Sequence, residues 1–310
     1  MSTPTTPIAV FVYNRPAVTQ KTLDQLRSDP QFNRHPVYVF CDGAKSSSDL
    51  AAVEQTRTIA RKCLSGFSPT IIQNGDNEGL AASVSKGVTR LVSQYGQIIV
   101  VEDDLLLSHG TLDYFDYSLC KYRGVERVMQ ISAHAYLPRS KPLHSTSYFM
   151  PMTTSWGWAT WSRAWSHFDS TARMAESVLK TKETRHRFDM EGSLGYSNML
   201  QQQLAYELDS WAVFWRLAMH CAGGLTLFPG KSLVRNEGFG EDATHTKRAA
   251  AWMVNPEWST AHSIKQYPDL CESDAEMWLK TTAYLRKYNY PNVPRRLFLR
   301  ILSLSRRIMK

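Results

Sequence analysis

The sequence has few cysteines, no long apolar run and no glycine-rich phosphate loop. None of its five cysteines forms a CxxC pair, which argues against a zinc site or a disulfide framework and for reduced thiols in a cytosolic compartment. They are Cys41, Cys63, Cys120, Cys221 and Cys271. No apolar run approaches the roughly 20 residues of a transmembrane helix, and the first residues lack the pattern of a signal peptide. We therefore expect a soluble protein.

Two common nucleotide-binding fingerprints are also missing. No GxGxxG follows the first apolar run, and no GxxxxGK[ST] occurs anywhere in the chain. Internal repeats and low-complexity segments are absent as well. If the chain binds a nucleotide, a metal must neutralise the phosphates in place of a glycine-rich turn.

Apolar residues occur in an alternating pattern of short runs and helical stripes. They make up 43% of the 310 residues, enough for one large domain or a domain with an appendage, and the net charge is +8. The runs predict strands at 8–13, 37–40, 70–73 and 98–101, and the stripes predict helices at about 16–27, 49–63 and 80–95. Strands that alternate with helices predict an α/β fold built on a mainly parallel sheet.

Three consecutive carboxylates, Glu102 to Asp104, follow the apolar run that ends at Val101. Polar residues also end two other predicted strands, at Asn14-Arg15 and at Asp42-Gly43. In open α/β sheets ligands bind at the carboxyl ends of the strands, and adjacent carboxylates suit a divalent cation that holds a diphosphate. Arg15 could contact phosphate or ribose, and Asp42 could accept a hydrogen bond from a base imide. The alternatives are an acidic loop before a helix and an ordinary Asp-Gly turn.

The order of four segments resembles a known group of enzymes. FVYNRP, CDGAK, NEGLAASVSKGV and VVEDDL look like the glycosyltransferases of the GT-A fold, closest to the inverting branch with N-acetylglucosaminyltransferase I and bacterial polysaccharide-assembly sugar transferases. Downstream, 148–151 with 155–161 resembles the acceptor-side aromatic segment, 209–211 the catalytic-base region, and 238–245 the late histidine segment. The resemblance covers roughly residues 8 to 246. It implies a metal-dependent, inverting transfer of a sugar from a nucleotide diphosphate, UDP by resemblance, to a hydroxyl.

The resemblance also implies roles for single residues. Asp104 matches the direct ligand of Mn²⁺ or Mg²⁺, and His245 matches a histidine that reaches back to the metal or diphosphate. Asp103 and Glu102 would contact sugar, ribose or metal-bound water. The remaining donor-side candidates are Asn14 and Arg15, the nucleobase-recognising Asp42, the turn at Asn77 and Gly79, and Lys86.

Asp209 matches the region of the catalytic base. Ser210 separates it from the tryptophan that directly follows the acid in the relatives, so Glu207 and the more distant Asp169 stay open as alternatives. An apolar stripe at helical spacing predicts a helix across this region, from Leu200 to Trp215. A carboxylate beside that stripe would be half-buried near aromatic rings, which would increase its basicity.

Four tryptophans lie within ten residues, at positions 156, 158, 161 and 165. They can fill a core or form a wall on which sugar rings stack, and both readings stay open. Beyond Pro294, apolar residues line one face of a helical pattern that is flanked by arginines. This predicts a basic amphipathic helix on an anionic membrane, the alternative being a terminal helix docked on the domain.

The expected organisation is a GT-A, Rossmann-like nucleotide-sugar half at 1–125, an aromatic-rich acceptor half at 126–290 and a basic tail at 291–310. The partners would be a nucleotide-sugar donor and a glycan or lipid-linked acceptor at the inner face of the cell membrane, with no nucleic acid. Two rival functions are a sugar-1-phosphate nucleotidyltransferase and a non-catalytic carbohydrate-binding protein. The first needs a basic glycine-rich loop that this chain lacks, and the second leaves the acidic strand end without purpose.

Overall fold

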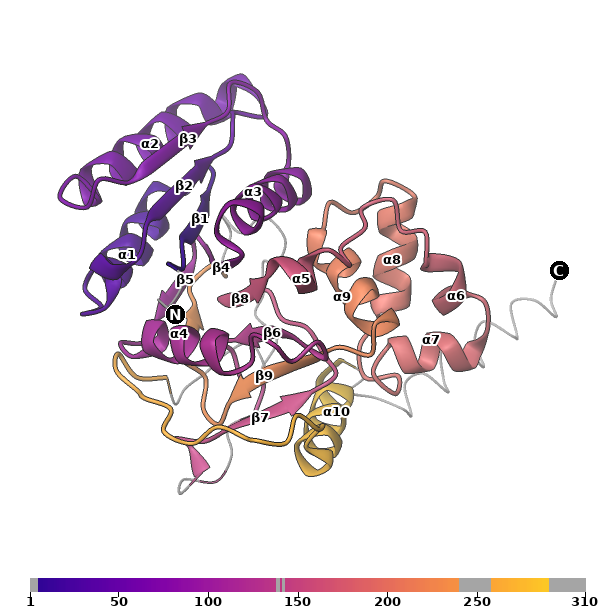
Figure 1. The fold of residues 1–310 in the computed structure, drawn as a ribbon. Coiled ribbons are helices and arrows are strands. Elements are labelled where there is room, and N and C mark those ends of the chain that lie inside the picture. The colour runs from indigo at the N-terminus through magenta and orange to yellow at the C-terminus, as the bar shows by residue number, and fades with distance from the viewer. Residues whose placement is uncertain (1–4, 138–139, 141–142, 240–257, 290–310) are drawn as a thin grey trace, which may run out of the picture.

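A computed structural model describes residues 5–137, 140, 143–239 and 258–289 of the chain (Figure 1). Its centre is an eight-stranded sheet with the order β3-β2-β1-β4-β8-β6-β9-β7. The strands are β1 (Ile8–Val12), β2 (Val37–Cys41), β3 (Thr70–Gln73), β4 (Gln97–Glu102), β6 (Val128–Ser132), β7 (Ser147–Met150), β8 (Trp158–Trp161) and β9 (Leu225–Pro229). A small second sheet pairs β5 (Leu105–Leu107) with β10 (Val234–Asn236) in antiparallel fashion.

The sheet is mainly parallel, as predicted. β3, β2, β1 and β4 pair in parallel, and so do β6 and β9. β8 runs antiparallel between β4 and β6, and β7 is an antiparallel edge strand on β9. All five residues of β1 and of β2 are buried, which explains why these strands are continuous apolar runs without alternation.

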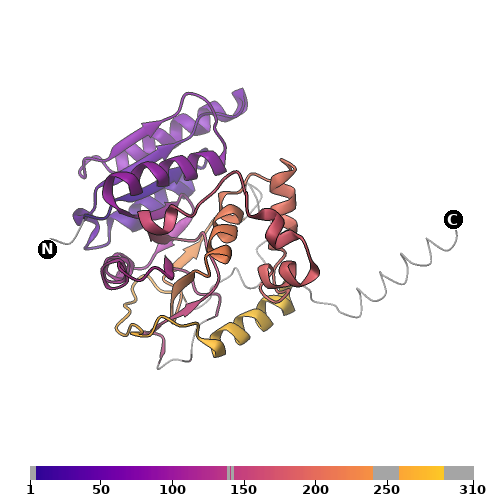
Figure 2. The same ribbon diagram turned by 45° about the vertical axis from the view of Figure 1, so that its right-hand side comes forward.

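Helices cover the sheet, and a further group of helices lies beside it (Figure 2). They are α1 (Pro16–Arg27), α2 (Leu50–Cys63), α3 (Leu80–Tyr95), α4 (Thr111–Lys121), α5 (Ser162–Trp165), α6 (Ala175–Leu179), α7 (Lys182–Phe188), α8 (Tyr196–Leu204), α9 (Trp211–Cys221) and α10 (Ala275–Asn289). The first three confirm the predicted helices. The apolar stripe of α3 (Val84, Val88, Leu91) is fully buried, and Gly96 ends the helix in the left-handed conformation.

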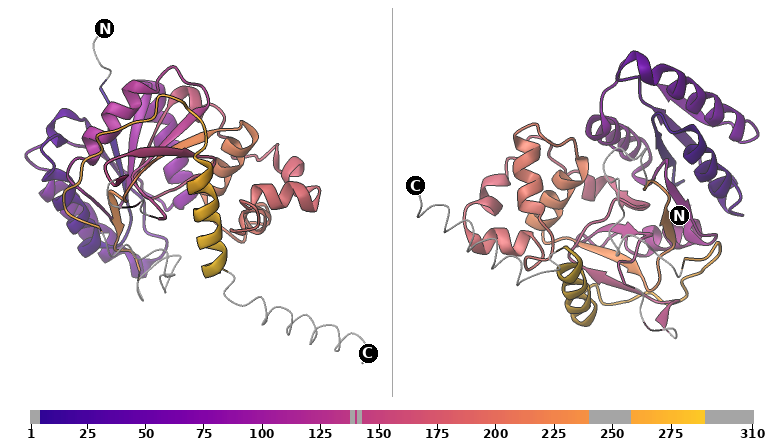
Figure 3. Two further views of the ribbon diagram at one scale, coloured as in Figure 1. Left: turned by 90° about the horizontal axis from the view of Figure 1, so that it is seen from below. Right: turned by 180° about the vertical axis from the view of Figure 1, so that it is seen from behind.

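The helices α6 to α9 form a lobe beside the sheet (Figures 1 and 3). Phe188, Leu200 and Phe214 belong to its own small apolar cluster. α10 packs elsewhere, with Met277 and Leu285 in a third cluster that also includes β7 and β9 residues.

The predicted helix through 200–215 is wrong, because the chain breaks between α8 and α9. Leu200 packs into the cluster of the helical lobe, whereas Trp211 and Trp215 pack into the main core under the sheet. Residues 205–210 separate the two helices, and α9 itself packs against both cores, since its Phe214 belongs to the cluster of the helical lobe. Leu204 is left 42% exposed, and Tyr206 takes a positive φ of 60° in the connecting loop.

Two sequence-based predictions lie outside the described residues. His245 falls within 240–257 and the basic tail within 290–310, so both stay predictions. Over the part of the chain that is described, no helix combines the length and hydrophobicity that crossing a membrane would require.

Candidate active site at the carboxyl edge of the sheet

The polar ends of β2, β1 and β4 lie at one edge of the sheet. These three strands are neighbours and parallel, so Asp42, Arg15 and the acids after Val101 leave the sheet on the same side. The sequence predicted this juxtaposition from parallel pairing alone. The expected candidates therefore form one polar region, in which β1 lies between the other two strands.

Arg15 is the cation of this region, and it bridges two of the three acids. Its guanidinium forms a bidentate pair with Asp103, with Nε at 3.3 Å from Oδ2 and Nη2 bonded to Oδ1. Nη2 also lies 3.1 Å from Asp104 Oδ2. The side chain of Arg15 is only 17% exposed, and both aspartates are buried. Such charge-assisted pairs are strong and directional.

Backbone contacts hold the acids in place from both sides. Thr22 of α1 donates to the carbonyl of Asp103 at 2.7 Å, and the amide of Glu237 donates to the carbonyl of Asp104 at 2.8 Å. A Cβ built on Gly238 would lie 1.9 Å from Asp104 Oδ2. Only glycine allows the backbone after β10 to rest directly on that carboxylate.

One guanidinium does not balance three carboxylates, and the pKa values reflect this. Burial raises the pKa of Glu102 to about 8, with added contributions from Asp104 and Asp103. Burial also raises the pKa of Asp103 to about 6, although Arg15 opposes the shift. The pKa of Asp104 is raised by burial against the same opposing guanidinium. A group of carboxyls with raised pKa values at a sheet edge is a functional-site signal.

The residues fit a hard divalent cation that is shared with a ligand. Within the described residues, no three His, Cys, Asp or Glu side chains converge as a complete protein-only metal site. Asp103 and Asp104 nevertheless direct oxygens at one point, the Nη2 of Arg15. Mg²⁺ and similar ions are commonly bound by one or two carboxylates together with substrate phosphates and water. Oxygen ligands of this number and kind match that mode.

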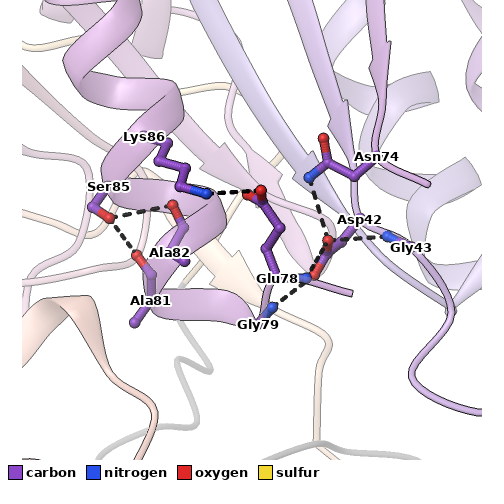
Figure 4. Close-up of polar contacts among 9 residues, drawn as sticks. All are labelled: Asp42, Gly43, Asn74, Glu78, Gly79, Ala81, Ala82, Ser85 and Lys86. Carbon is purple, nitrogen blue, oxygen red and sulfur yellow. Dashed lines mark hydrogen bonds and ion pairs between the residues drawn. The ribbon is translucent and has the colours of Figure 1, made fainter. Parts of the chain in front are cut away.

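Asp42 is the centre of a hydrogen-bonded loop (Figure 4). Its carboxylate is 6% exposed and accepts five hydrogen bonds at 3.0–3.4 Å. The donors are the amides of Gly43, Glu78 and Gly79 and the side chains of Asn74 and Asn77. A carboxylate offers about four lone-pair positions, so the protein itself occupies them. The predicted nucleobase contact of Asp42 stays a prediction.

Two other donor-side candidates face the same loop or its neighbourhood. Lys86 of α3 forms a 2.7 Å ion pair with Glu78, and its own side chain is 67% exposed (Figure 4). Asn14 donates a hydrogen bond of 3.5 Å to Asp49 Oδ1. Lys86 thus borders the loop, whereas Asn14 points its amide toward the start of α2.

Asp209 lies in a different setting from the predicted one. It is exposed in the loop before α9, and its carboxylate accepts hydrogen bonds from the amides of Leu80 (2.8 Å) and Ala81 (3.2 Å) at the start of α3. The half-buried position beside aromatic rings was wrong, because that expectation assumed the unbroken helix. Asp209 instead joins the helical lobe to the donor-side loop.

The two alternative acids are placed differently. Glu207 is exposed in the same loop. Asp169 follows α5 and accepts hydrogen bonds from Thr171 and Arg173, which hold its pKa well below its usual range. A carboxylate committed to its own turn in this way is a poor proton acceptor.

The four tryptophans separate into two roles. Trp158, Trp161 and Trp165 are at most 4% exposed and belong to the main core. Trp156 is partly exposed and contacts the rings of His134 (4.6 Å) and Phe239 (5.8 Å). Three are therefore core residues, and only Trp156 is placed to line the region near Gly238.

His134 is a residue that sequence reasoning missed. It follows β6, is 2% exposed, and has a pKa lowered to about 3 by burial. No residue that the structure describes forms a hydrogen bond with its Nε2. The available signal was a polar residue just after a fifth short apolar run, 128–132.

No family model and no curated protein sequence matches the chain, but solved structures resemble it. A cytidylyltransferase from Leptospira borgpetersenii is 12% identical, over 55% of this chain and 66% of its own, with a TM-score of 0.36. GalNAc-T7, with UDP, GalNAc and Mn²⁺, is 10% identical over 76% of this chain and 44% of its own, at 0.46. Mouse xyloside xylosyltransferase 1 is 10% identical over 72% and 83%, at 0.37.

The chain spans less than two thirds of the length of the first two structures. At these identities and TM-scores, the likeness establishes no family, substrate or reaction for this chain. The α/β architecture is defined by its own strand order and pairing.

Proposed function

We propose that the chain is a metal-dependent glycosyltransferase that uses a nucleotide diphosphate sugar, a UDP-sugar by resemblance. The observation that carries the proposal is the edge cluster: Glu102, Asp103 and Asp104 around the single guanidinium of Arg15. An uncompensated acidic cluster at the carboxyl ends of parallel strands suits a cation and a diphosphate. The motif order described above supports the sugar as the transferred group.

Asp104, with Asp103 beside it, would hold Mn²⁺ or Mg²⁺, and His245 stays a proposed further ligand. When bound there, the ion would stabilise the negative charge that develops on the leaving diphosphate. Arg15 is close enough to the acids to turn its guanidinium toward phosphate oxygens, a geometry that arginine suits well. Glu102 and Asp103 are proposed to contact the sugar or ribose.

Asp209 is proposed as the general base. The acceptor hydroxyl oxygen would attack the anomeric carbon from the face opposite the diphosphate, and the carbon–oxygen bond to the phosphate would break with its electrons going to the diphosphate. The hydroxyl proton would pass to Asp209. Because the attack comes from the face opposite the leaving group, the configuration at the anomeric carbon would be inverted. Two of its lone-pair positions accept amides of α3, and an exposed carboxylate retains others for a hydroxyl.

The acceptor and location form a finer part of the proposal. A glycan or lipid-linked acceptor in bacterial surface polysaccharide synthesis would place the protein at the inner face of the membrane, through residues 294–310. Deleting these residues should release the protein from anionic vesicles and preserve activity on a soluble acceptor, and wild-type binding should weaken in high salt. Equal vesicle binding by the full and truncated chains would refute the membrane role.

The test of the function is a panel of nucleotide sugars with Mn²⁺, with and without chelator. Release of nucleoside diphosphate that chelation abolishes and metal restores is the expected result. Asp104→Asn should lower this release by at least about a hundredfold without unfolding the protein. Pyrophosphate chemistry with a sugar-1-phosphate would indicate nucleotidyl transfer, and sugar binding without turnover would indicate a binding protein.

A further inference from the structure

Four consecutive amides, those of residues 78–81, are divided equally between two carboxylates. Glu78 and Gly79 donate to Oδ1 and Oδ2 of Asp42, at 3.0 and 3.1 Å. The next two amides donate to Oδ2 and Oδ1 of Asp209, at 2.8 and 3.2 Å. The two acids come from opposite halves of the chain, and the four amides that contact them belong to one continuous backbone segment, residues 78–81. A displacement of one pair of amides therefore displaces the other pair.

The Asp42 side of this segment is rigidly held. A Cβ on Gly43 would lie 2.3 Å from the carbonyl carbon of Asp76, so the loop rests directly on the backbone that follows β2. Arg57 of α2 donates to the carbonyls of Asp42 (3.3 Å) and Asn74 (2.6 Å) and so links the end of β2 to the start of the loop after β3. With both loop ends fixed, the carboxylate of Asp42 determines where α3 begins.

The Asp209 side has less support of its own. Asp209 is exposed in the loop before α9, and both hydrogen bonds that its carboxylate accepts from the described residues come from the start of α3. A Cβ on Gly79 would lie 2.7 Å from Asp209 Oδ2, so the carboxylate is seated against the backbone at the junction. The amide of the neighbouring Ser210 donates to Gln203 Oε1 at 2.7 Å and holds the backbone of this loop. The amides of residues 80 and 81 therefore set the orientation of the Asp209 carboxylate.

We propose that Asp42 is a positioning residue for Asp209, which it aligns through the amides of residues 78–81, and that it does not read the nucleobase. The inference rests on the proposed function only in taking Asp209 as the base. Its five donors leave Asp42 no lone pair for a base imide. In this arrangement residues 78–81, on the proposed donor side, determine the orientation of the Asp209 carboxylate on the proposed acceptor side.

The first test reads the amides directly and needs neither ligand nor activity. Proteins labelled with [¹⁵N]leucine and [¹⁵N]alanine report Leu80 and Ala81, whose hydrogen bonds go to Asp209 and not to Asp42. Asp42→Asn should move both signals in the direction that Asp209→Asn moves them. Asp76→Asn is the matched control, because it removes an exposed charge from the same loop and leaves all five hydrogen bonds to Asp42 in place.

If the Leu80 and Ala81 signals of Asp42→Asn coincide with those of the wild type, the positioning role is refuted. Circular dichroism checks the fold of each variant. Should Asp42→Asn fail to fold, Asn77→Ala takes its place, since it removes the side chain that donates to Asp42 and to the carbonyl of Gly43, and it carries the same expectation. Unmoved signals in that variant refute the proposal in the same way.

The second test separates positioning from base recognition. Calorimetry with Mn²⁺ gives the ratio of the Kd values for UDP and CDP in the wild type and in Asp42→Asn. Positioning predicts an unchanged ratio. A lost hydrogen bond between the carboxylate and the uracil imide would change it by roughly tenfold to a hundredfold and would overturn the proposal. If neither nucleotide binds the wild type, the proposed function fails, and the amide test still decides the positioning.

Discussion

Substituting Gly79 by alanine strains a backbone with positive φ and also displaces the carboxylate of Asp209. Substitutions at two other glycines allow these two effects to be measured separately. Gly79 has φ +82° and ψ 162°, and an added Cβ would lie 2.7 Å from Asp209 Oδ2. Gly96 at the other end of α3 has a similar φ of +79° but nothing within 4 Å of its Cβ position. Gly66 has neither the positive φ nor a neighbour. The three variants thus form a graded series.

The expected losses of unfolding free energy follow from these geometries. Gly66→Ala should be neutral or stabilise by up to about 1 kcal/mol, because alanine restricts the unfolded chain. Gly96→Ala should cost about 1–2 kcal/mol for its left-handed backbone. Gly79→Ala adds a displaced Asp209 to a backbone strain of about 1–3 kcal/mol. Losing two hydrogen bonds at an exposed site adds about 1 kcal/mol each, so the total is about 3–5 kcal/mol.

Urea unfolding followed by circular dichroism measures the series, with the slope m checked for constancy. The order of midpoints should be Gly66→Ala highest, Gly96→Ala intermediate and Gly79→Ala lowest. If Gly79→Ala and Gly96→Ala lose the same free energy, then the Asp209 carboxylate does not rest on the backbone at Gly79. In that case the division of the four amides between two acids would also be wrong.

Three further predictions concern the base, the aromatic residues and pH. Asp209→Asn should bind nucleotide and metal normally and lose transfer roughly a hundred- to ten-thousandfold, whereas Glu207→Gln should be mild; the opposite result would move the base to Glu207. Trp158→Ala should destabilise the fold by about 3–5 kcal/mol because its ring is fully buried, and Trp156→Ala should cost less and weaken ligand binding, as urea melts and calorimetry would show. Burial lowers the pKa of His134 from 6.5 to about 3 in the folded state, so its contribution to stability is complete above about pH 6.5 and is lost as the pH falls toward 3. In His134→Gln the urea midpoint should therefore change less with pH over that range. If the midpoint of this variant changes with pH as it does in the wild type, His134 does not have the lowered pKa.

Local pattern alone determined the first part of the fold, from β1 to β4. Strands β1 to β4 and helices α1 to α3 lie where the sequence predicted them, because each is a short buried run or a stripe with a clear period. Parallel pairing then placed Arg15, Asp42 and the acids after Val101 at one edge, since parallel strands end on the same side of a sheet. The edge cluster could thus be predicted before its contacts were known.

The surroundings of Asp209 and of the tryptophans depended on tertiary packing. The stripe from Leu200 to Trp215 has one helical period, yet α8 ends at Leu204 and α9 begins at Trp211 and packs against both the main core and the cluster of the helical lobe. Trp158 and Trp156 are two residues apart in the sequence, but β8 places the first in the core and leaves the second partly exposed. Periodicity describes one element at a time and contains no information on which core an element meets.

The hydrogen-bond partners of the two central aspartates were likewise decided only in three dimensions. Asp209 and Leu80 are 129 positions apart, and Asp42 and Gly79 are 37 apart. Asp42 was a candidate because it ends a predicted strand, and Asp209 because it precedes an aromatic segment that resembles a catalytic-base region. Each acid accepts two backbone amides of residues 78–81, because a glycine-containing turn brings four N–H groups between two elements that the sheet and the helical lobe hold in place. No spacing within either segment encodes that meeting.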